Sequence, residues 1–194
     1  MRPAERPEIE ALAAAMAKAF VDDPVWTWFL PRADRLVRLR RGFRLFLGWL
    51  WLRHDLTFTS ASRPGAACWL PPGRWHPSPL VQAAMLPGLI AVFGSGLTRA
   101  GRGLARIEAV HPTEPHYYLA VVGVEPAWQG QGLGSALMQP VLQRCDAEGV
   151  AAYLEASTRR GRALYERHGF SVTDEVRLPE GPPLWPMWRE PRTG

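Results

Sequence analysis

The stretch YYLAVVGVEPAWQGQGLGSA, residues 117–136, decides how this chain folds. Its first part, Tyr117–Val124, is an apolar run with the length of a buried strand. Glu125 and Pro126 end that run, and a loop with glycines at positions 130, 132 and 134 then leads into a helical segment. Exposed backbone N–H groups at the start of a helix bind anions, so the loop predicts a site for a phosphate-bearing ligand.

The spacing of the glycines excludes two common phosphate-binding loops. A Walker loop needs a lysine followed by Ser or Thr after its last glycine, and this loop contains no lysine. A dinucleotide-binding loop needs its third glycine at position 135, where this chain has Ser135. Two interpretations remain, a glycine-rich turn between a strand and a helix or a loop for another phosphate-bearing ligand.

The order of strand, Pro, Gln, glycines and helix resembles the Q/R-x-x-G-x-G/A signature of the GNAT acetyltransferases, carried here by Gln129–Gly134. In that family the loop holds the pyrophosphate of acetyl-coenzyme A (acetyl-CoA), so the resemblance implies this cosubstrate. It also implies that backbone N–H groups near Val122 and Val124 face the pantetheine arm and the carbonyl. The implied cofactor-binding residues are Val122, Gly123, Val124, Gln129, Gly130, Gln131, Gly132, Leu133, Gly134 and Ser135.

The composition is that of an ordinary globular protein, with 194 residues, 47% of them hydrophobic and 21% charged. This length suits one domain with a substantial core, and we expect a single domain over residues 1–194. Cys68 and Cys145 cannot form a disulfide framework, and the absence of a zinc-type spacing leads us to expect no metal. The N-terminus carries acidic residues and no signal-peptide pattern, which predicts a cytoplasmic protein.

The net charge of +5 suits an anionic small ligand, and it would also suit nucleic acid. The basic clusters Arg32–Arg44 and Arg99–Arg106 lack the stacked aromatic pattern of an RNA-binding sheet, so we interpret them as solvated helix faces. The longest apolar runs, Leu45–Leu52 and Met85–Leu97, are shorter than a membrane span. We therefore expect neither nucleic acid nor a membrane as a partner, while a homodimer stays open.

Hydrophobic periodicity predicts an α/β chain. In the N-terminal half we expect a first strand limited to Met1–Ala4, then the following: a helix over Ala4–Phe20, a helix over Arg35–Arg53 with Leu36 inward, strands at Leu56–Ser60 and Ala66–Leu70, and irregular helix over 77–107 broken by Pro87, Gly94, Gly96, Gly101 and Gly103.

In the second half we expect strands and helices to alternate: a strand over 117–124, a helix from about Gly132 to Glu148, a strand at Ala151–Ala156, a helix at about Arg162–His168, and strands at Ser171–Leu178 and Leu184–Arg189. Hairpins pair strands antiparallel, whereas crossovers through a helix require parallel neighbours. The chain thus predicts the GNAT fold, a single mixed sheet flanked by helices.

Segments downstream of the loop extend the resemblance over roughly residues 115–190. The sequences AAYLEAS at 151–157 and LYERHGF at 164–170 are most similar to the puromycin N-acetyltransferases of this family. The resemblance implies that Tyr165 is a general acid for the leaving sulfur, and the alternative is a tyrosine that packs in the core. Four residues earlier, where the family commonly has an asparagine, this chain has Gly161, which removes a hydrogen bond worth about 1 kcal/mol.

Attack of an amine on a thioester also requires a base. Glu155 is our candidate, because it ends a strand next to the expected sheet opening and an apolar site raises the pKa of a carboxyl group. The alternatives are an ordinary strand-end residue or an orienting hydrogen-bond partner. For His111 and His116, which flank a Pro-rich loop, we favour structural or substrate-rim roles over metal binding.

These observations predict an N-acetyltransferase that moves an acetyl group from acetyl-CoA to a primary amine of a small molecule by direct attack. The acceptor cannot be read from the sequence, and we do not expect it to be puromycin itself. One alternative is a protein or peptide N-acetyltransferase, and another is a non-catalytic acyl-CoA-binding regulatory protein. Five aromatic residues either line a flat acceptor pocket or pack in the core: Trp26, Trp28, Phe29, Trp69 and Trp75.

Overall fold

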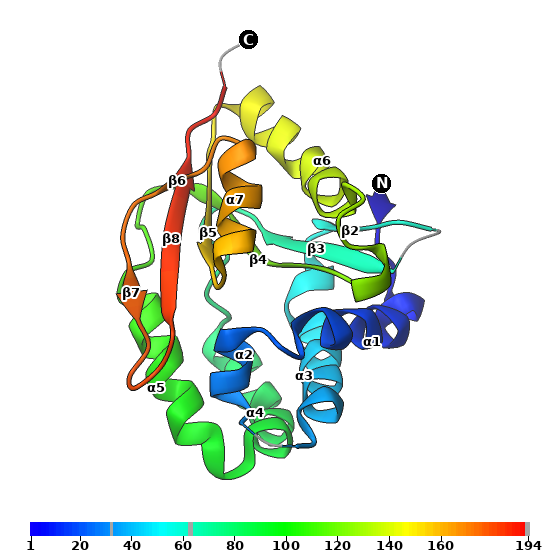
Figure 1. The fold of residues 1–194 in the computed structure, drawn as a ribbon, viewed down its shortest axis with the longest axis vertical. Coiled ribbons are helices and arrows are strands. Elements are labelled where there is room, and N and C mark those ends of the chain that lie inside the picture. Colours follow the sequence, from blue (N-terminus) through cyan, green and yellow to red (C-terminus); the bar gives the residue numbers. More distant parts are fainter. Residues whose placement is uncertain (32, 62–63, 193–194) are drawn as a thin grey trace.

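A mixed β-sheet runs through the molecule, shown in Figure 1 as a computed structural model that describes residues 1–31, 33–61 and 64–192. Arg32, the first residue of one basic cluster, therefore lies outside the described residues. The spatial order of the main sheet is β1-β2-β3-β4-β5-β8-β6, and β7 pairs with β8. The strands are β1 (Arg2–Pro3), β2 (Thr57–Thr59), β3 (Gly65–Leu70), β4 (His116–Val124), β5 (Ala151–Ala156), β6 (Ser171–Val172), β7 (Val176–Arg177) and β8 (Pro183–Arg189).

Helices cover both faces of this sheet, as predicted. α6 packs on one face, and α1 and α3 pack on the other, where Figure 1 shows them on opposite sides of β3 and β4. The helices are α1 (Ile9–Phe20), α2 (Pro24–Phe29), α3 (Arg35–Trp49), α4 (Pro79–Phe93), α5 (Leu97–Glu108), α6 (Leu133–Glu148) and α7 (Arg159–Arg167), with short 3₁₀ turns at Arg6–Glu8, Trp51–Arg53, Gly94–Gly96 and Pro126–Trp128.

The two central strands separate halfway along their length. β4 and β5 pair in parallel only from His116 to Tyr118, opposite Ala151 to Tyr153. β4 then continues to Val124 alongside β3, and β5 continues alongside β8, so the two strands form a fork. Backbone groups that face into the fork have no neighbouring strand there among the described residues, and they are available to a ligand.

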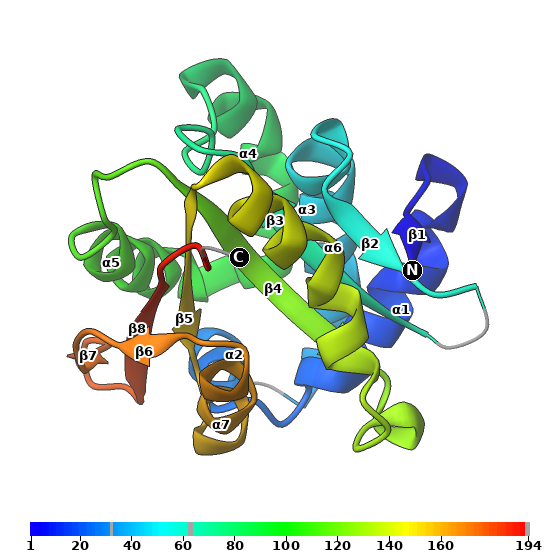
Figure 2. The same ribbon diagram turned by 90° about the horizontal axis from the view of Figure 1, so that it is seen from above.

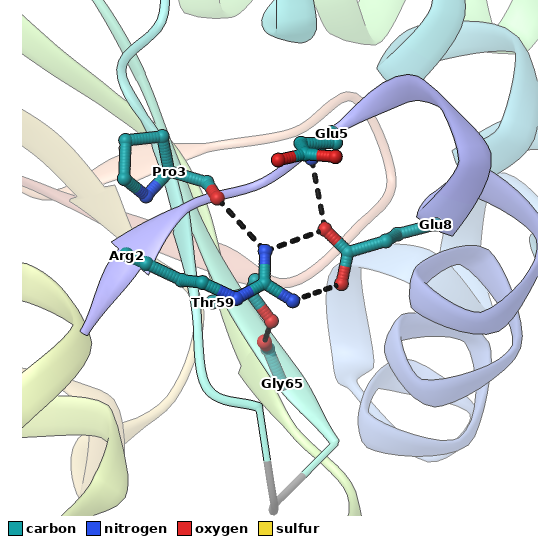
Figure 3. A network of polar contacts seen from close by, with 6 residues as sticks. All are labelled: Arg2, Pro3, Glu5, Glu8, Thr59 and Gly65. Carbon is teal, nitrogen blue, oxygen red and sulfur yellow. Dashed lines mark hydrogen bonds and ion pairs between the residues drawn. The ribbon is translucent and has the colours of Figure 1, made fainter.

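The N-terminal edge of the sheet is short and is held by side chains. Arg2 donates two hydrogen bonds to the carboxylate of Glu8, at 2.9 and 2.6 Å, and the Glu5 backbone N–H donates to the same carboxylate at 2.9 Å (Figure 3). On the adjoining hairpin, Thr59 Oγ1 donates to the Gly65 carbonyl at 2.8 Å. These contacts join the two-residue strand to the turn that leads into α1, in agreement with the very short first strand that we predicted.

The predicted breaks in the 77–107 segment are mostly wrong. α4 continues through Pro87, and α5 contains Gly101 and Gly103, so the only interruption is the turn Gly94–Gly96. Close packing explains one of these positions: a Cβ on Gly103 would lie 2.7 Å from the Trp28 ring, whereas one on Gly101 would meet nothing within 4 Å. Tertiary contacts thus hold helix at Gly103, where propensity alone predicts a break.

Two further predictions in the helices and strands are corrected. The expected strand Ser171–Leu178 is two short strands, because the Thr173 backbone N–H and hydroxyl both donate to the Pro186 carbonyl and the chain then leaves the edge of the sheet. Leu36 points outward, with 45% of its surface exposed, rather than into the core.

The helical stretch Pro79–Glu108 is longer than the apolar runs that we judged too short to span a membrane. Its 30 residues contain an 18-residue window with mean hydropathy 1.7, so by length and composition it qualifies as a candidate membrane span. A core helix of a soluble protein can meet the same criterion, but only 22% of this window is buried. The exposed apolar surface of this stretch is taken up below.

Candidate active site

The fork between β4 and β5 opens into a cleft of 580 Å³. The end of α1 and the chain after it form one wall, and the last residues of β4 form the floor. The loop 126–132, the start of α6 and one side of α7 complete the cleft. The glycine loop identified in the sequence therefore borders this cleft at the fork in the sheet.

The glycine loop presents free backbone at the start of α6. Gly130 and Gly132 both have φ of +78°, a left-handed conformation that favours glycine, and a Cβ at either position would meet nothing within 4 Å. Gly132 is the N-cap of α6 and caps it with no side-chain hydrogen bond. The first N–H groups of this helix have no partner inside the helix, so they and the helix dipole favour an anion at this position.

Three cationic side chains line the same cleft: Lys18, Arg160 and Arg167. Lys18 also forms an ion pair with Glu125 at 2.6 Å, which ties α1 to the end of β4. The sequence analysis missed all three, because they come from α1 and α7 and meet at the loop only in the folded chain. With the glycine loop they make an electropositive site of the kind that the pyrophosphate of coenzyme A would require.

Nine of the ten residues predicted to bind the cofactor line this cleft, and Gln131 is the exception. Gln131 Nε2 donates to the Ala127 carbonyl at 3.4 Å, and Gln129 Nε2 donates to the Val124 carbonyl at 2.9 Å. Gln129 therefore holds the loop onto β4, and Gln131 holds the loop onto its own 3₁₀ turn. Their binding role, like that of the other eight residues, stays a prediction.

Two other predicted residues have specific packing requirements. A Cβ on Gly123 would lie 2.7 Å from the Phe20 ring and 2.8 Å from Met16 Sδ, so only glycine fits between β4 and α1. Ser135 Oγ lies 2.9 Å from Nε2 of His168, for which the sequence suggested no partner. This contact joins the first turn of α6 to the end of α7.

Tyr165 lies in the cleft, as we predicted, on the inner side of α7. Burial raises the pKa of its hydroxyl, and the negative charge of Asp23 raises it further. The hydroxyl is therefore protonated at neutral pH, which a general acid requires. Gly161 also lines the cleft, and a Cβ there would lie 3.1 Å from Thr158 Oγ1, the atom that caps α7.

Asp23 is a second carboxylate in the cleft that the sequence analysis missed. Its Oδ1 accepts the backbone N–H groups of Val25 and Trp26 and so caps α2, while Ser157 Oγ donates to its Oδ2. The residue is only 9% exposed, and burial raises the pKa of its carboxyl group even though these hydrogen bonds lower it. An aspartate directly before Pro24 indicates the start of a helix, so the sequence could have identified Asp23 as a helix cap. It could not show that Asp23 lies close enough to Tyr165 for its charge to act on the hydroxyl.

Glu155 lies on β5 at the fork but is not among the residues that line the cleft. Its side chain is 8% exposed, and its Oε2 accepts a hydrogen bond of 2.8 Å from Tyr118 Oη. Its Oε1 lies 3.7 Å from His111 Nδ1, and neither of these buried atoms has a hydrogen-bond partner among the described residues. The assignment of Glu155 as the base is untested by this geometry and stays a prediction.

His111 and His116 belong to the same buried group. Their Nε2 atoms are 3.0 Å apart, so one ring donates a hydrogen bond to the other. Burial lowers the pKa of His116. Trp75 stacks on the ring of His111 at 3.8 Å. Within the described residues no three His, Cys, Asp or Glu side chains are arranged to hold a metal ion. The two histidines thus form a buried group with Glu155, and the structural or substrate-rim roles that we expected stay predictions.

The aromatic residues proposed for an acceptor pocket mostly pack in the core. Trp69 is fully buried between the sheet and α6, and Trp26 packs against Phe20 and Phe43. Trp28 packs against α5, where Gly103 provides the space for its ring. The interpretation of Trp69 as pocket lining is therefore wrong, since its side chain has no exposed surface.

Comparisons with known proteins point to one superfamily. Residues 94–170 match the model of the Acetyltransferase (GNAT) family. An uncharacterized N-acetyltransferase of Schizosaccharomyces pombe, C550.08, is 25% identical over 97% of this chain and 82% of its own length. A structure from Corynebacterium glutamicum, described as histone acetyltransferase HPA2 and related acetyltransferase, has a TM-score of 0.74 and 26% identity over 99% of this chain and 96% of its own.

The Drosophila melanogaster polyamine N-acetyltransferase has the same fold, with a TM-score of 0.63 and 16% identity over 97% of this chain and 98% of its own. The GNAT family generally uses acetyl-CoA, and the loop, cations and open glycines of the cleft fit that molecule. The similarity to puromycin N-acetyltransferases has no support from these comparisons. The chain thus has the GNAT fold, and its sequence is similar to that of GNAT acetyltransferases over residues 94–170.

Proposed function

We propose that this chain transfers the acetyl group of acetyl-CoA to a primary amine of a small molecule by direct attack. One observation carries the proposal: Asp23 and Tyr165 lie in the same cleft as the uncapped start of α6. A carboxylate and a protonated phenol beside an anion-binding loop are the groups that transfer from a thioester to an amine requires.

The two side chains have complementary roles in this proposal. Acetyl-CoA supplies the activated acetyl group, and the amine forms a C–N bond to its carbonyl carbon as the C–S bond breaks. Asp23 accepts the proton that the ammonium must lose, because its raised pKa makes it a stronger base than an exposed aspartate. Tyr165 donates its proton to the departing sulfur, and unpaired N–H groups of β4 in the fork stabilise the carbonyl oxygen.

Glu155 remains a rival for the role of base. Glu155 lies on β5, two residues before Ser157. Ser157 donates a hydrogen bond to Asp23, so this serine connects the strand of one carboxylate to the other carboxylate. Glu155 could accept the proton itself or could orient Tyr118 on the acceptor side of the sheet. Variants of the two carboxylates separate these roles.

Two aspartates at the end of α1, apart from the cations of the cleft, support a small cationic acceptor. Asp22 and Asp23 both line the cleft and attract an ammonium group toward the fork. The polyamine N-acetyltransferase that shares this fold acts on acceptors of that kind, according to its name. Diamines and polyamines are therefore the first substrates to test, and puromycin is not expected to be an efficient one.

The test measures release of coenzyme A with single isosteric substitutions. We expect Tyr165→Phe and Asp23→Asn each to reduce kcat by about 10²-fold or more, because each removes one proton-transfer group. Tyr117→Phe is the matched control: its hydroxyl donates to Glu148 on the α6 side, so turnover should stay close to wild type. Full turnover in Asp23→Asn combined with loss in Glu155→Gln would assign the base to Glu155 instead.

The alternatives give different results in the same assay. A non-catalytic acyl-CoA-binding protein would bind acetyl-CoA and release no thiol with any amine. A protein or peptide N-acetyltransferase would be active with peptide N-termini or lysine side chains and inactive with small amines. Either result would contradict the proposal.

A further inference from the structure

The exposed apolar side chains of this protein gather on one part of its surface. Of the eight large hydrophobic residues that are exposed, six lie on α3, α4 and α5: Leu36, Val37, Leu80, Leu86, Ile90 and Leu104. Leu80 is 84% exposed and Ile90 is 51% exposed. These three helices lie at the end of the molecule away from α6 in Figure 1, and Figure 2 shows α4 on the side opposite α7. The surface is therefore remote from the candidate active site.

The sequence of α4 differs from that of an ordinary surface helix. No Asp, Glu, Lys or Arg occurs between Arg74 and Arg99, and α4 lies entirely within that interval. A helix that is apolar on all sides is normally buried or in contact with lipid. In this protein only 22% of the apolar window is buried, so most of it faces outward.

Arginines line a groove on the side of α4 that faces α3, where Gly88, Ala91 and Val92 of α4 contribute to the lining. The groove has a volume of 740 Å³, and its lining includes Arg6, Arg41, Arg44 and Arg53. Ile9, Leu45 and Val92 form apolar parts of the same groove. Between Arg35 and His54 the chain contains no acidic residue, and Glu10 is the acidic partner of both Arg40 and Arg44. The groove thus has an excess of positive charge beside an uncharged apolar face.

We infer that α4 and the α3–α4 groove form a docking surface for an anionic lipid bilayer. Arginine side chains in the groove would bind lipid phosphates, and the apolar residues of α4 would enter the boundary between headgroups and acyl chains. A second copy of this chain is a poorer occupant, because two such surfaces would bring arginines together without acidic partners. An acidic peptide would satisfy the arginines but would leave the outward face of α4 uncovered.

The experiment is cosedimentation of the full chain with vesicles. Vesicles with equal parts of phosphatidylglycerol and phosphatidylcholine should bind the protein at low salt, and vesicles of phosphatidylcholine alone should bind it much less. Binding should fall steeply at about 0.5 M salt, where charges on the surface are screened. No binding to the anionic vesicles at low salt would overturn the inference.

Variants locate the binding surface. Arg41→Glu with Arg53→Glu should reduce partitioning by at least about tenfold, since each basic residue at a membrane contributes about 1 kcal/mol. Arg177→Glu on β7 is the control for a charge reversal, because its side chain is 70% exposed and distant from α4, and it should change partitioning little. Leu86→Ser with Ile90→Ser, one helical turn apart, should also reduce partitioning without changing net charge.

The remaining outcomes are equally informative. Each variant should unfold cooperatively at a temperature close to that of the wild-type chain, which establishes that it is folded. If Leu86→Ser with Ile90→Ser dissociates a dimer seen by light scattering, and the wild-type chain binds no vesicles, the occupant is a second copy and the inference is wrong. Equal loss of vesicle binding in Arg177→Glu would show that net charge alone, rather than this surface, attracts the protein to the membrane.

Discussion

Individual glycines and carboxylates set the chemistry of the cleft. Gly130 and Gly132 adopt a left-handed backbone that leaves the start of α6 open, and Gly123 allows β4 to approach α1. Two effects act in opposite directions on Asp23. The backbone N–H groups that it accepts as the cap of α2 lower the pKa of its carboxyl group, and burial raises that pKa by more.

A pair of glycines tests the phosphate-binding loop. Gly132 and Gly149 both have positive φ, and a Cβ would meet nothing within 4 Å at either position, so alanine imposes similar backbone strain at both. Only Gly132 borders the cleft. We expect Gly132→Ala to weaken acetyl-CoA binding by about tenfold or more, because backbone N–H groups lose their approach to phosphate.

Isothermal titration calorimetry measures this difference. Gly149→Ala should show the same fall in thermal stability and an unchanged Kd for acetyl-CoA. If the two variants bind acetyl-CoA equally well, the loop does not hold the phosphates.

Asp23→Asn should raise thermal stability while it reduces activity. Because burial raises the folded-state pKa of Asp23, the ionised carboxylate costs free energy of folding at neutral pH. Asparagine keeps an acceptor for the cap of α2 and can donate to Ser157. The Tm difference should be largest at neutral pH and should disappear below about pH 4, the pKa of an unfolded aspartate.

Calorimetric scans of both proteins between acidic and neutral pH check this prediction. A lower Tm for Asp23→Asn at neutral pH would mean that the ionised carboxylate stabilises the fold. The raised pKa that supports its role as a base would then be wrong.

At the scale of elements, the sequence predicts best where local and tertiary preferences agree. The strand at 151–156 has the predicted bounds, and the predicted strand 117–124 and helix 132–148 are each within one residue of the structure. α7 begins at Arg159, three residues before the prediction, because Thr158 caps it. The break predicted at Gly103 was wrong because this glycine provides close packing against Trp28, which is far away in sequence.

A buried ion pair joins α6 to β8. Arg189, whose side chain is 3% exposed, contacts Asp146 at 2.8 Å and donates to the His168 carbonyl at 2.9 Å. Arg189 lowers the pKa of Asp146, so the pair stabilises the fold above the unfolded-state pKa and loses that contribution as pH falls through the folded-state pKa. Asp146→Asn leaves a buried guanidinium without its charge partner and should cost roughly 2 kcal/mol at neutral pH.

Denaturant unfolding at neutral and acidic pH measures this loss, which should shrink at acidic pH. Glu166→Gln is the control, because it breaks an exposed pair with Arg162 in α7 and should leave stability nearly unchanged. Equal effects of the two substitutions would show that burial of Arg189 does not matter.

At the scale of the whole molecule, the candidate site is assembled from distant segments. The sequence located the glycine loop and Tyr165, because they lie within local motifs. It could not locate Asp23, Lys18 and Arg160, because no local pattern shows that the end of α1 and the start of α7 meet at the fork. It also gave no reason to expect that most of an apolar helix would be exposed, since exposure depends on what the fold places against it.

The most direct measurement of the central claim is release of free coenzyme A from acetyl-CoA, followed with a thiol reagent across a panel of primary amines. The proposed enzyme releases thiol only when acetyl-CoA and an accepted amine are both present, and mass spectrometry finds the amine heavier by one acetyl group. Tyr165→Phe should bind acetyl-CoA with wild-type affinity and release thiol about 10²-fold more slowly. Acetyl-CoA binding with no thiol release from any small amine, or release unaffected by Tyr165→Phe, would contradict this account.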